Sequence, residues 1–175
     1  MDTGLNVSAF ALVSGALTAL LLLACAIGFA MVWRERASLR RLAALHGYRY
    51  HGFGEFGSEH AGVSWRCAPH QDDDSGRAWT EFVAGGAALL LAGACTEVDL
   101  EHAPDWIDDP IRTLWRQAQG TSASLRLSMA PHSLTLVRED GRRRATPDQV
   151  CALAAMGQAC VERLVASANR APAGA

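Results

Sequence analysis

The chain has 175 residues, half of them apolar, which is enough for one hydrophobic core once a membrane segment is set aside. All 16 of its basic residues are arginines, and the absence of lysine excludes Schiff-base chemistry, a Walker-type phosphate loop and a Ser-Lys dyad. Against 18 acidic residues these arginines leave the chain nearly neutral, so it has no basic field for holding a nucleic acid.

The first element in chain order is an apolar segment over residues 7–33, which contains no charge. As a helix with a rise of about 1.5 Å per residue it would cover about 40 Å, more than the hydrocarbon core of about 30 Å. We therefore expect a transmembrane helix over these residues, after a short external N-terminus formed by residues 1–6.

An arginine cluster follows the apolar segment at once: Arg34, Arg36, Arg40 and Arg41. The other flank carries Asp2 and no basic residue, so the positive-inside rule predicts an external N-terminus and a cytoplasmic C-terminal domain. The abundance of Ala, Arg and Gly without lysine is typical of a GC-rich bacterial genome. The sequence thus predicts a single-pass protein of a bacterial inner membrane.

Two other interpretations of this segment would put the domain outside the cytoplasm. A cleaved signal peptide needs a basic N-terminal region and a short apolar core, and this chain has neither. Residues 22–25, which end in Cys25, loosely match a lipoprotein cleavage site, but the apolar run continues beyond them to Val32. We favour an uncleaved anchor over both.

Small residues recur every four positions in the apolar segment, at Ala11, Gly15 and Ala19. Such a helix face lets another helix backbone approach closely, which predicts contact with a membrane-protein partner or with a second copy of the chain. The competing explanation is that alanine and glycine are simply abundant in this sequence.

The helix is expected to continue into the cytoplasm over residues 34–46, because this stretch contains no glycine or proline and its apolar residues follow helical spacing. Gly47 is its natural stop. The arginines of this juxtamembrane extension are candidates for contact with anionic headgroups, although the topology signal is a sufficient reason for them.

A soluble domain is expected over residues 47–170, since the pattern changes to short β-rich runs separated by Gly, Asp and Pro. Strands are predicted at residues 48–53, 63–67, 78–83 and 88–98. The glycines from Gly52 to Gly57 indicate a flexible loop near the membrane. The uncharged run at residues 82–95 is too short for a second span and is interrupted by two glycines.

A short helix is predicted after Asp108, because an acidic cap and a proline at the first helical position begin helices well, and Gly120 ends it. A β-hairpin follows, with strands on either side of residues 130–133.

The last helix is the clearest element of the domain. Thr146 and Gln149 form a capping box, and an apolar face runs from there to about residue 169. Residues 171–175 are expected to be a disordered tail.

The predicted fold class is α+β, an antiparallel sheet with the short helix and the long C-terminal helix packed on it. A small barrel closed by a C-terminal helix, as in PH-like modules, has a compatible element order.

No metal or other cofactor is indicated. The odd number of cysteines, without a Cys-x-x-Cys pair, argues against a disulfide framework and for a reducing compartment. Cys67 and His70 form a Cys-x-x-His pair, but no second pair has matching zinc spacing, so they are weak candidates. Residues 72–76 resemble the start of a calcium loop, whose twelfth position is Val83 instead of an acid.

A cysteine nucleophile assisted by a histidine is the enzymatic alternative. The nucleophile would be Cys67 or Cys95, and the base would be His51, His60 or His70. Nothing local favours this site, because most cysteines in apolar runs are inert core residues.

The densest basic patch of the domain consists of Arg142, Arg143 and Arg144, with Arg138 close by in sequence. In a membrane-tethered domain such a patch is a candidate for contact with anionic lipid or an acidic partner.

We therefore expect a membrane-tethered, non-enzymatic accessory or scaffold protein that acts through its span and its cytoplasmic domain. The alternatives are a ligand- or lipid-sensing domain at the inner leaflet and, behind it, a Cys/His hydrolase. A pocket lined by residues 52–57 would favour sensing, and a Cys–His contact of hydrogen-bond length would favour the hydrolase.

Overall fold

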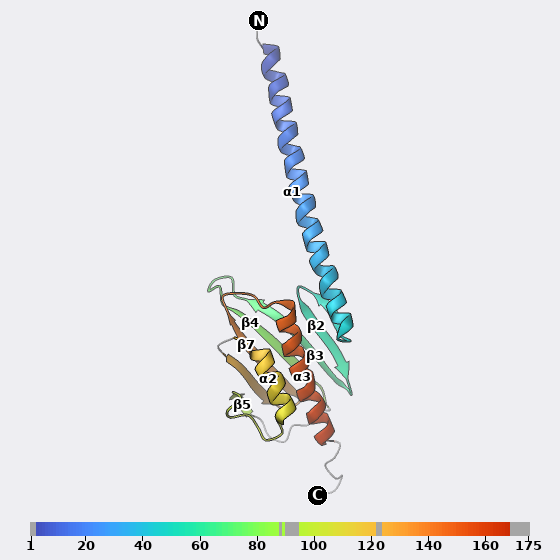
Figure 1. Cartoon of the computed structure of the whole chain (residues 1–175), viewed down its shortest axis with the longest axis vertical. Coiled ribbons are helices and arrows are strands. Elements are labelled where there is room, and N and C mark those ends of the chain that lie inside the picture. The colour runs from blue at the N-terminus through green and yellow to red at the C-terminus, as the bar shows by residue number, and fades with distance from the viewer. Residues whose placement is uncertain (1–2, 88, 90–94, 122–123, 169–175) are drawn as a thin grey trace. The chain divides into compact units, whose positions relative to one another are not determined.

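Figure 1 shows the chain as a computed structural model, which describes residues 3–87, 89, 95–121 and 124–168. The chain divides into two compact units between Arg41 and Leu42. The first unit is a helix, and the second contains a sheet with two further helices.

Helix α1, Thr3–Leu45, starts in the first unit and ends in the second. It confirms the prediction that the apolar segment and the extension at residues 34–46 form one continuous helix. From Val13 onward α1 is long and apolar enough to cross a bilayer, a property that it shares with signal sequences near an N-terminus. Its large apolar side chains from Val13 to Trp33 are exposed.

The chain reverses immediately after α1. Gly47 adopts a φ of +71°, which is the left-handed conformation expected of a glycine that stops a helix. The backbone N–H of Tyr48 donates to the carbonyl of Ala43 at 2.8 Å, and the Tyr48 ring meets Trp65 edge-on with 4.9 Å between centroids. The first strand is thereby attached to the domain core.

The domain is built on a seven-stranded antiparallel sheet with the order β1-β2-β3-β4-β7-β6-β5. The strands are β1 Arg49–Gly52, β2 Glu55–His60, β3 Val63–Gln71, β4 Ala78–Gly85, β5 Cys95–Val98, β6 Ser124–Ala130 and β7 Ser133–Gly141. The first four strands form a meander, and the β6–β7 hairpin joins it through the pairing of β7 with β4.

Two helices cover one face of this sheet, called the inner face here; Figure 1 shows them side by side across it. Helix α2, Asp109–Gln119, is capped by the Asp108 carboxylate, which accepts from the Ile111 N–H at 3.3 Å. Helix α3, Pro147–Ala168, begins at the predicted capping box, and 56 % of its most apolar stretch is buried. It is therefore a core helix of the domain.

The core lies between the inner face and the helices. Alternate residues of the central strands are fully or almost fully buried there: Val63, Trp65, Cys67, Phe82, Ala84, Leu127, Leu134 and Leu136. The intervening residues point to the opposite, outer face, which α2 and α3 do not cover. This alternation confirms the expected antiparallel α+β architecture.

Two expectations need correction. Residues 52–57 are not a flexible loop, because Gly52 ends β1 and Gly57 lies in β2, so that only a tight turn separates two paired strands. The PH-like barrel also fails, because β1 and β5 lie at opposite ends of an open strand order. Of the strand predicted at 88–98 the structure describes Cys95–Val98, and the tail at 171–175 lies outside the described residues.

Candidate functional site

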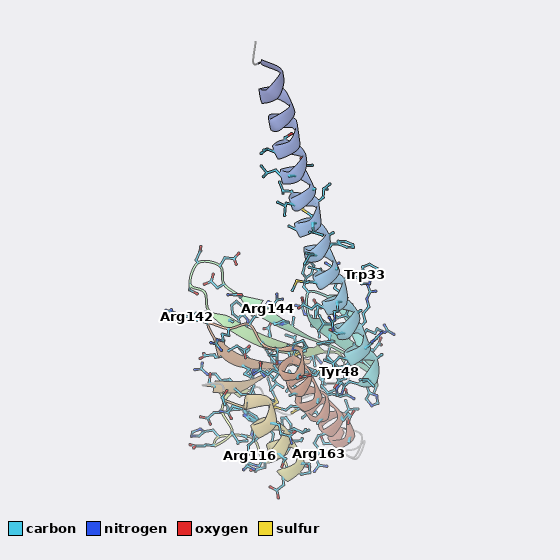
Figure 2. All side chains as sticks on the ribbon, turned by 45° about the horizontal axis from the view of Figure 1, so that its top comes forward. Trp33, Tyr48, Arg116, Arg142, Arg144 and Arg163 are labelled. Atoms are coloured by element: carbon cyan, nitrogen blue, oxygen red, sulfur yellow. The ribbon has the colours of Figure 1, made fainter. Side chains whose placement is uncertain are left out.

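The three arginines at residues 142–144, called the arginine loop here, connect β7 to α3 and are all exposed. The Arg144 guanidinium Nη2 donates to the carbonyl oxygen of Phe53 at 2.7 Å. This hydrogen bond fixes the loop beside the β1–β2 turn, so residues about 90 positions apart in sequence share one end of the domain. Figure 2 shows Arg142 and Arg144 apart from Arg116 of α2 and Arg163 of α3.

The β1–β2 turn consists of Phe53 and Gly54, both with positive φ values of 50° and 83°. Two successive positive φ angles are typical of a type I′ hairpin turn, for which Asn-Gly is the usual sequence. Phe53 is strained in this conformation, and its side chain is 83 % exposed. Sequence analysis missed this residue, although a phenylalanine between two glycines was the available signal.

Arg138 is not part of this patch, despite its proximity in sequence. Its side chain is 1 % exposed and points into the inner face, where Nε donates to the Asp140 carboxylate at 2.7 Å. Nη1 donates to the carbonyls of Ala118 in α2 and Gln149 in α3, at 2.9 and 3.1 Å. One guanidinium therefore links β7 to both helices, which is a structural role.

The outer face of the sheet is hollowed next to the arginine loop. A groove of about 620 Å³ lies over β4 and β7, with Trp79 and Val137 as apolar lining and Arg77, Arg142 and Glu139 as charged lining. Its lining could accept a ligand that is partly apolar and partly anionic.

A second outer-face groove, of about 400 Å³, lies over β2, β3 and β4. It is lined in part by His51, Arg66 and Val83. Glu55 is the single contribution to this lining from residues 52–57, the segment that sequence analysis associated with a ligand pocket.

Cys67 and His70 do not converge, because they lie on opposite faces of β3. Cys67 is fully buried on the inner face, where its thiol donates to the Val150 carbonyl at 3.6 Å, and burial raises its pKa. His70 stacks on Trp79 on the outer face and lies 3.7 Å from the Glu81 carboxylate. The described residues contain no group of three or more side chains arranged to hold a metal ion.

The other cysteine–histidine combinations are also spread out in the fold. His51 lies over Gly57, on the outer face opposite Arg66, and His60 pairs with Val63 at the far end of the β2–β3 hairpin from Cys67. A buried thiol with a raised pKa is a poor nucleophile, because the thiolate is the reactive form. The Cys95 side chain lies outside the described residues.

The acidic turn between β3 and β4 closes on itself. The Ser75 hydroxyl and the Asp74 N–H both donate to the Asp72 carboxylate, at 2.5 and 3.2 Å, and lower its pKa in that order of effect. This arrangement is that of a solvated turn held by its own hydrogen bonds.

The candidate residues of α1 lie on exposed parts of the helix. Gly15 and Ala19 are exposed, whereas the side chain of Ala11 lies outside the described residues. A methyl group built on Gly15 meets nothing within 4 Å. The four arginines that follow the apolar segment are exposed as well: Arg34, Arg36, Arg40 and Arg41.

Comparison of the chain with protein-family models, with curated proteins and with solved structures finds no match.

Proposed function

We propose that this chain is a membrane-tethered, non-enzymatic accessory or scaffold protein of a bacterial inner membrane. In this proposal α1 is an uncleaved anchor with its N-terminus outside. Its small-residue face contacts a membrane-protein partner or a second copy of the chain, and the α+β domain acts in the cytoplasm.

The observation that carries the proposal is the direct junction between a long apolar helix and a folded domain. An uncharged segment of residues 7–33 lies inside one helix, and the same helix leads into the domain at Leu42 without a flexible linker. A secreted enzyme with a removable leader does not need so short a connection, whereas a tethered module needs it to keep its domain close to the bilayer.

A ligand- or lipid-sensing domain is the second candidate, and the outer-face groove beside the arginine loop favours it. Apolar lining from Trp79 and Val137 next to Arg77 and Arg142 suits an anionic amphiphile. The Cys/His hydrolase ranks behind both, since Cys67 is buried away from the histidines.

Co-purification from native membranes tests the first proposal. The tagged full-length chain is extracted in mild detergent, and the stoichiometry of any companion is measured by mass spectrometry. We expect a near-stoichiometric membrane protein, or a second copy of the chain, that is lost in the variant Gly15→Leu/Ala19→Leu. Added leucine side chains would block close approach of a second helix, while Gly15 has free space around it in the isolated chain.

The matched control is Ala24→Leu/Gly28→Leu. These residues have the same spacing but lie on roughly the opposite face, given about 100° of rotation per residue, and a methyl group on Gly28 also meets nothing within 4 Å. The control should keep the companion. Recovery of the wild-type chain as a lone monomer would contradict the accessory function.

A further inference from the structure

We infer that Phe53 and the arginine loop form a single lipid-docking surface, through which the domain rests on the anionic surface of the bilayer. This inference rests on the proposed membrane anchor, and it deepens that function by naming the second contact with the membrane.

The first reason for this inference is Phe53, since a phenylalanine is unfavourable both in the backbone conformation of this turn and at so exposed a position. A type I′ turn favours Asn or Gly, whereas a phenylalanine with a φ of +50° is strained and gains nothing by burial at 83 % exposure. Strained, exposed residues that persist in a fold are candidates for function. A bare aromatic ring at a turn tip is suited to the interface between headgroups and acyl chains.

The arginine loop is the second reason, because it is hydrogen-bonded to the turn that carries this ring. Arg144 is hydrogen-bonded to the Phe53 carbonyl, and Arg142 and Arg143, which precede it in the loop, are exposed. An apolar tip joined to an exposed arginine loop matches a membrane surface, where the ring would enter the interface and the guanidinium groups would meet phosphates. A phosphorylated peptide could bind the guanidinium groups through its phosphate, but it would leave the Phe53 ring in water.

The charge of the arginines alone is not sufficient to bind this end of the domain to an anionic bilayer. Ala78 pairs with Gly141, so the β3–β4 turn lies beside the arginine loop and brings three exposed or half-exposed aspartates next to Arg77. The positive charge of Arg77 and the arginine loop is thus largely offset by the negative charge of Asp72, Asp73 and Asp74. Docking therefore requires the Phe53 ring together with the arginines. Removal of the ring alone, or of the arginines alone, should each weaken it.

The tether keeps the bilayer within reach. Only the eight residues 34–41 separate the end of the uncharged segment from the domain unit, about 12 Å as a helix. At that distance weak contacts become effective, because they are intramolecular once the anchor is inserted.

Hydrogen–deuterium exchange of the full-length chain in lipid nanodiscs tests this inference. Discs of phosphatidylcholine alone are compared with discs that also contain phosphatidylglycerol. We expect the amides of residues 52–54 and 142–144 to exchange at least about fivefold more slowly in the anionic discs, since each arginine at such a surface contributes about that factor. Free inorganic phosphate, added to the neutral discs, should not reproduce the effect.

Three variants separate docking from folding. Phe53→Asn suits the turn better, so it should raise the urea midpoint of the domain while it reduces the protection. Arg142→Gln/Arg143→Gln should reduce the protection without changing the midpoint, and it spares the Arg144 hydrogen bond. Arg116→Gln removes an exposed arginine of α2, outside the proposed surface, and should change neither.

Equal exchange in both kinds of disc, or full protection in the Phe53 and arginine-loop variants, would overturn the inference. So would protection produced by phosphate alone. Failure of the chain to co-elute with nanodiscs would instead contradict the anchor itself, so the two failures are distinguishable.

Discussion

At the scale of single residues, Arg138 shows how a buried charge is accommodated in the core. Its guanidinium reaches Asp140, two helix carbonyls and the Thr80 hydroxyl, while that hydroxyl donates to the second Asp140 oxygen at 2.5 Å. Both charged side chains are almost completely buried, at 1 % and 4 % exposure. Such a pair adds little net stability compared with apolar residues, but loss of one partner leaves the other charge unpaired.

We therefore expect Arg138→Met to destabilise the domain by about 3–5 kcal/mol, because the Asp140 carboxylate stays buried without its cation. Urea unfolding of the full-length chain in detergent, followed by tryptophan fluorescence, measures this free energy. The double variant Arg138→Met/Asp140→Leu should lose less than the single variant, since it removes the orphaned charge as well. Arg142→Met, at an exposed position, should stay within about 0.5 kcal/mol of the wild type. A similar loss in both single variants would show that the buried pair has no special role.

The position of Arg138 was predictable in part. Leu134, Leu136 and Arg138 alternate along one strand, so the period of two places the arginine on the inner face with the leucines. Its partners were not predictable, because Thr80, Ala118 and Gln149 come from other elements that only the fold assembles. Arg138 was grouped with Arg142, Arg143 and Arg144 because they are close in sequence. The alternation of residues along the strand predicts its position better.

At the scale of elements, α3 packs so closely on the sheet that one position has no room for a side chain. A methyl group built on Gly157 would lie 2.6 Å from three ring carbons of Phe82, whose ring is fully buried in β4 and cannot move away. The glycine is therefore a packing requirement of the contact between helix and sheet, although glycine is a poor residue for a helix interior.

Gly157→Ala should accordingly destabilise the domain. Overpacking costs about 1–3 kcal/mol and the better helix propensity returns about 1 kcal/mol, so we expect a net loss of up to about 2 kcal/mol in urea unfolding. Combined with Phe82→Leu, the Gly157→Ala change should cost less stability than it does alone, since the smaller side chain at position 82 makes room for the alanine. Stabilisation by Gly157→Ala alone would mean that α3 stands further from β4 than the structure indicates.

Elements with strong local signals were predicted well. The Thr146 N–H donates to the Gln149 side chain at 2.8 Å and the Gln149 N–H to the Thr146 hydroxyl at 3.4 Å, which is the capping box read from the sequence. The β1–β2 hairpin was missed because its glycines indicate a loop, and a strained Phe53 in the turn gives no standard hairpin signal. Pairing of β4 with β7 joins residues about 50 or more positions apart, so local patterns cannot predict it.

At the scale of the whole molecule, the proposed function depends on the side of the membrane on which the domain lies. An uncharged helix with arginines on one flank predicts a cytoplasmic domain, while a cleaved signal peptide or a lipidated Cys25 would both predict an external one. The three possibilities differ in what remains of the N-terminus and in where the C-terminus can be reached.

Protease protection in a bacterial host distinguishes these possibilities. For the full-length chain with a C-terminal tag, we expect the tag to survive protease treatment of spheroplasts and to be cleaved in inside-out vesicles. The positive-inside rule assigns this orientation to the arginine flank, so replacing Arg34, Arg36, Arg40 and Arg41 by glutamate should expose the tag to protease in spheroplasts for a substantial fraction of the molecules. The matched control replaces four other exposed arginines, Arg77, Arg116, Arg142 and Arg143, by glutamate and should keep the wild-type pattern, since these residues lie far beyond the anchor in sequence. An intact mass without the first residues, or a tag cleaved in wild-type spheroplasts, would contradict the cytoplasmic topology and with it the lipid-docking surface at the inner leaflet.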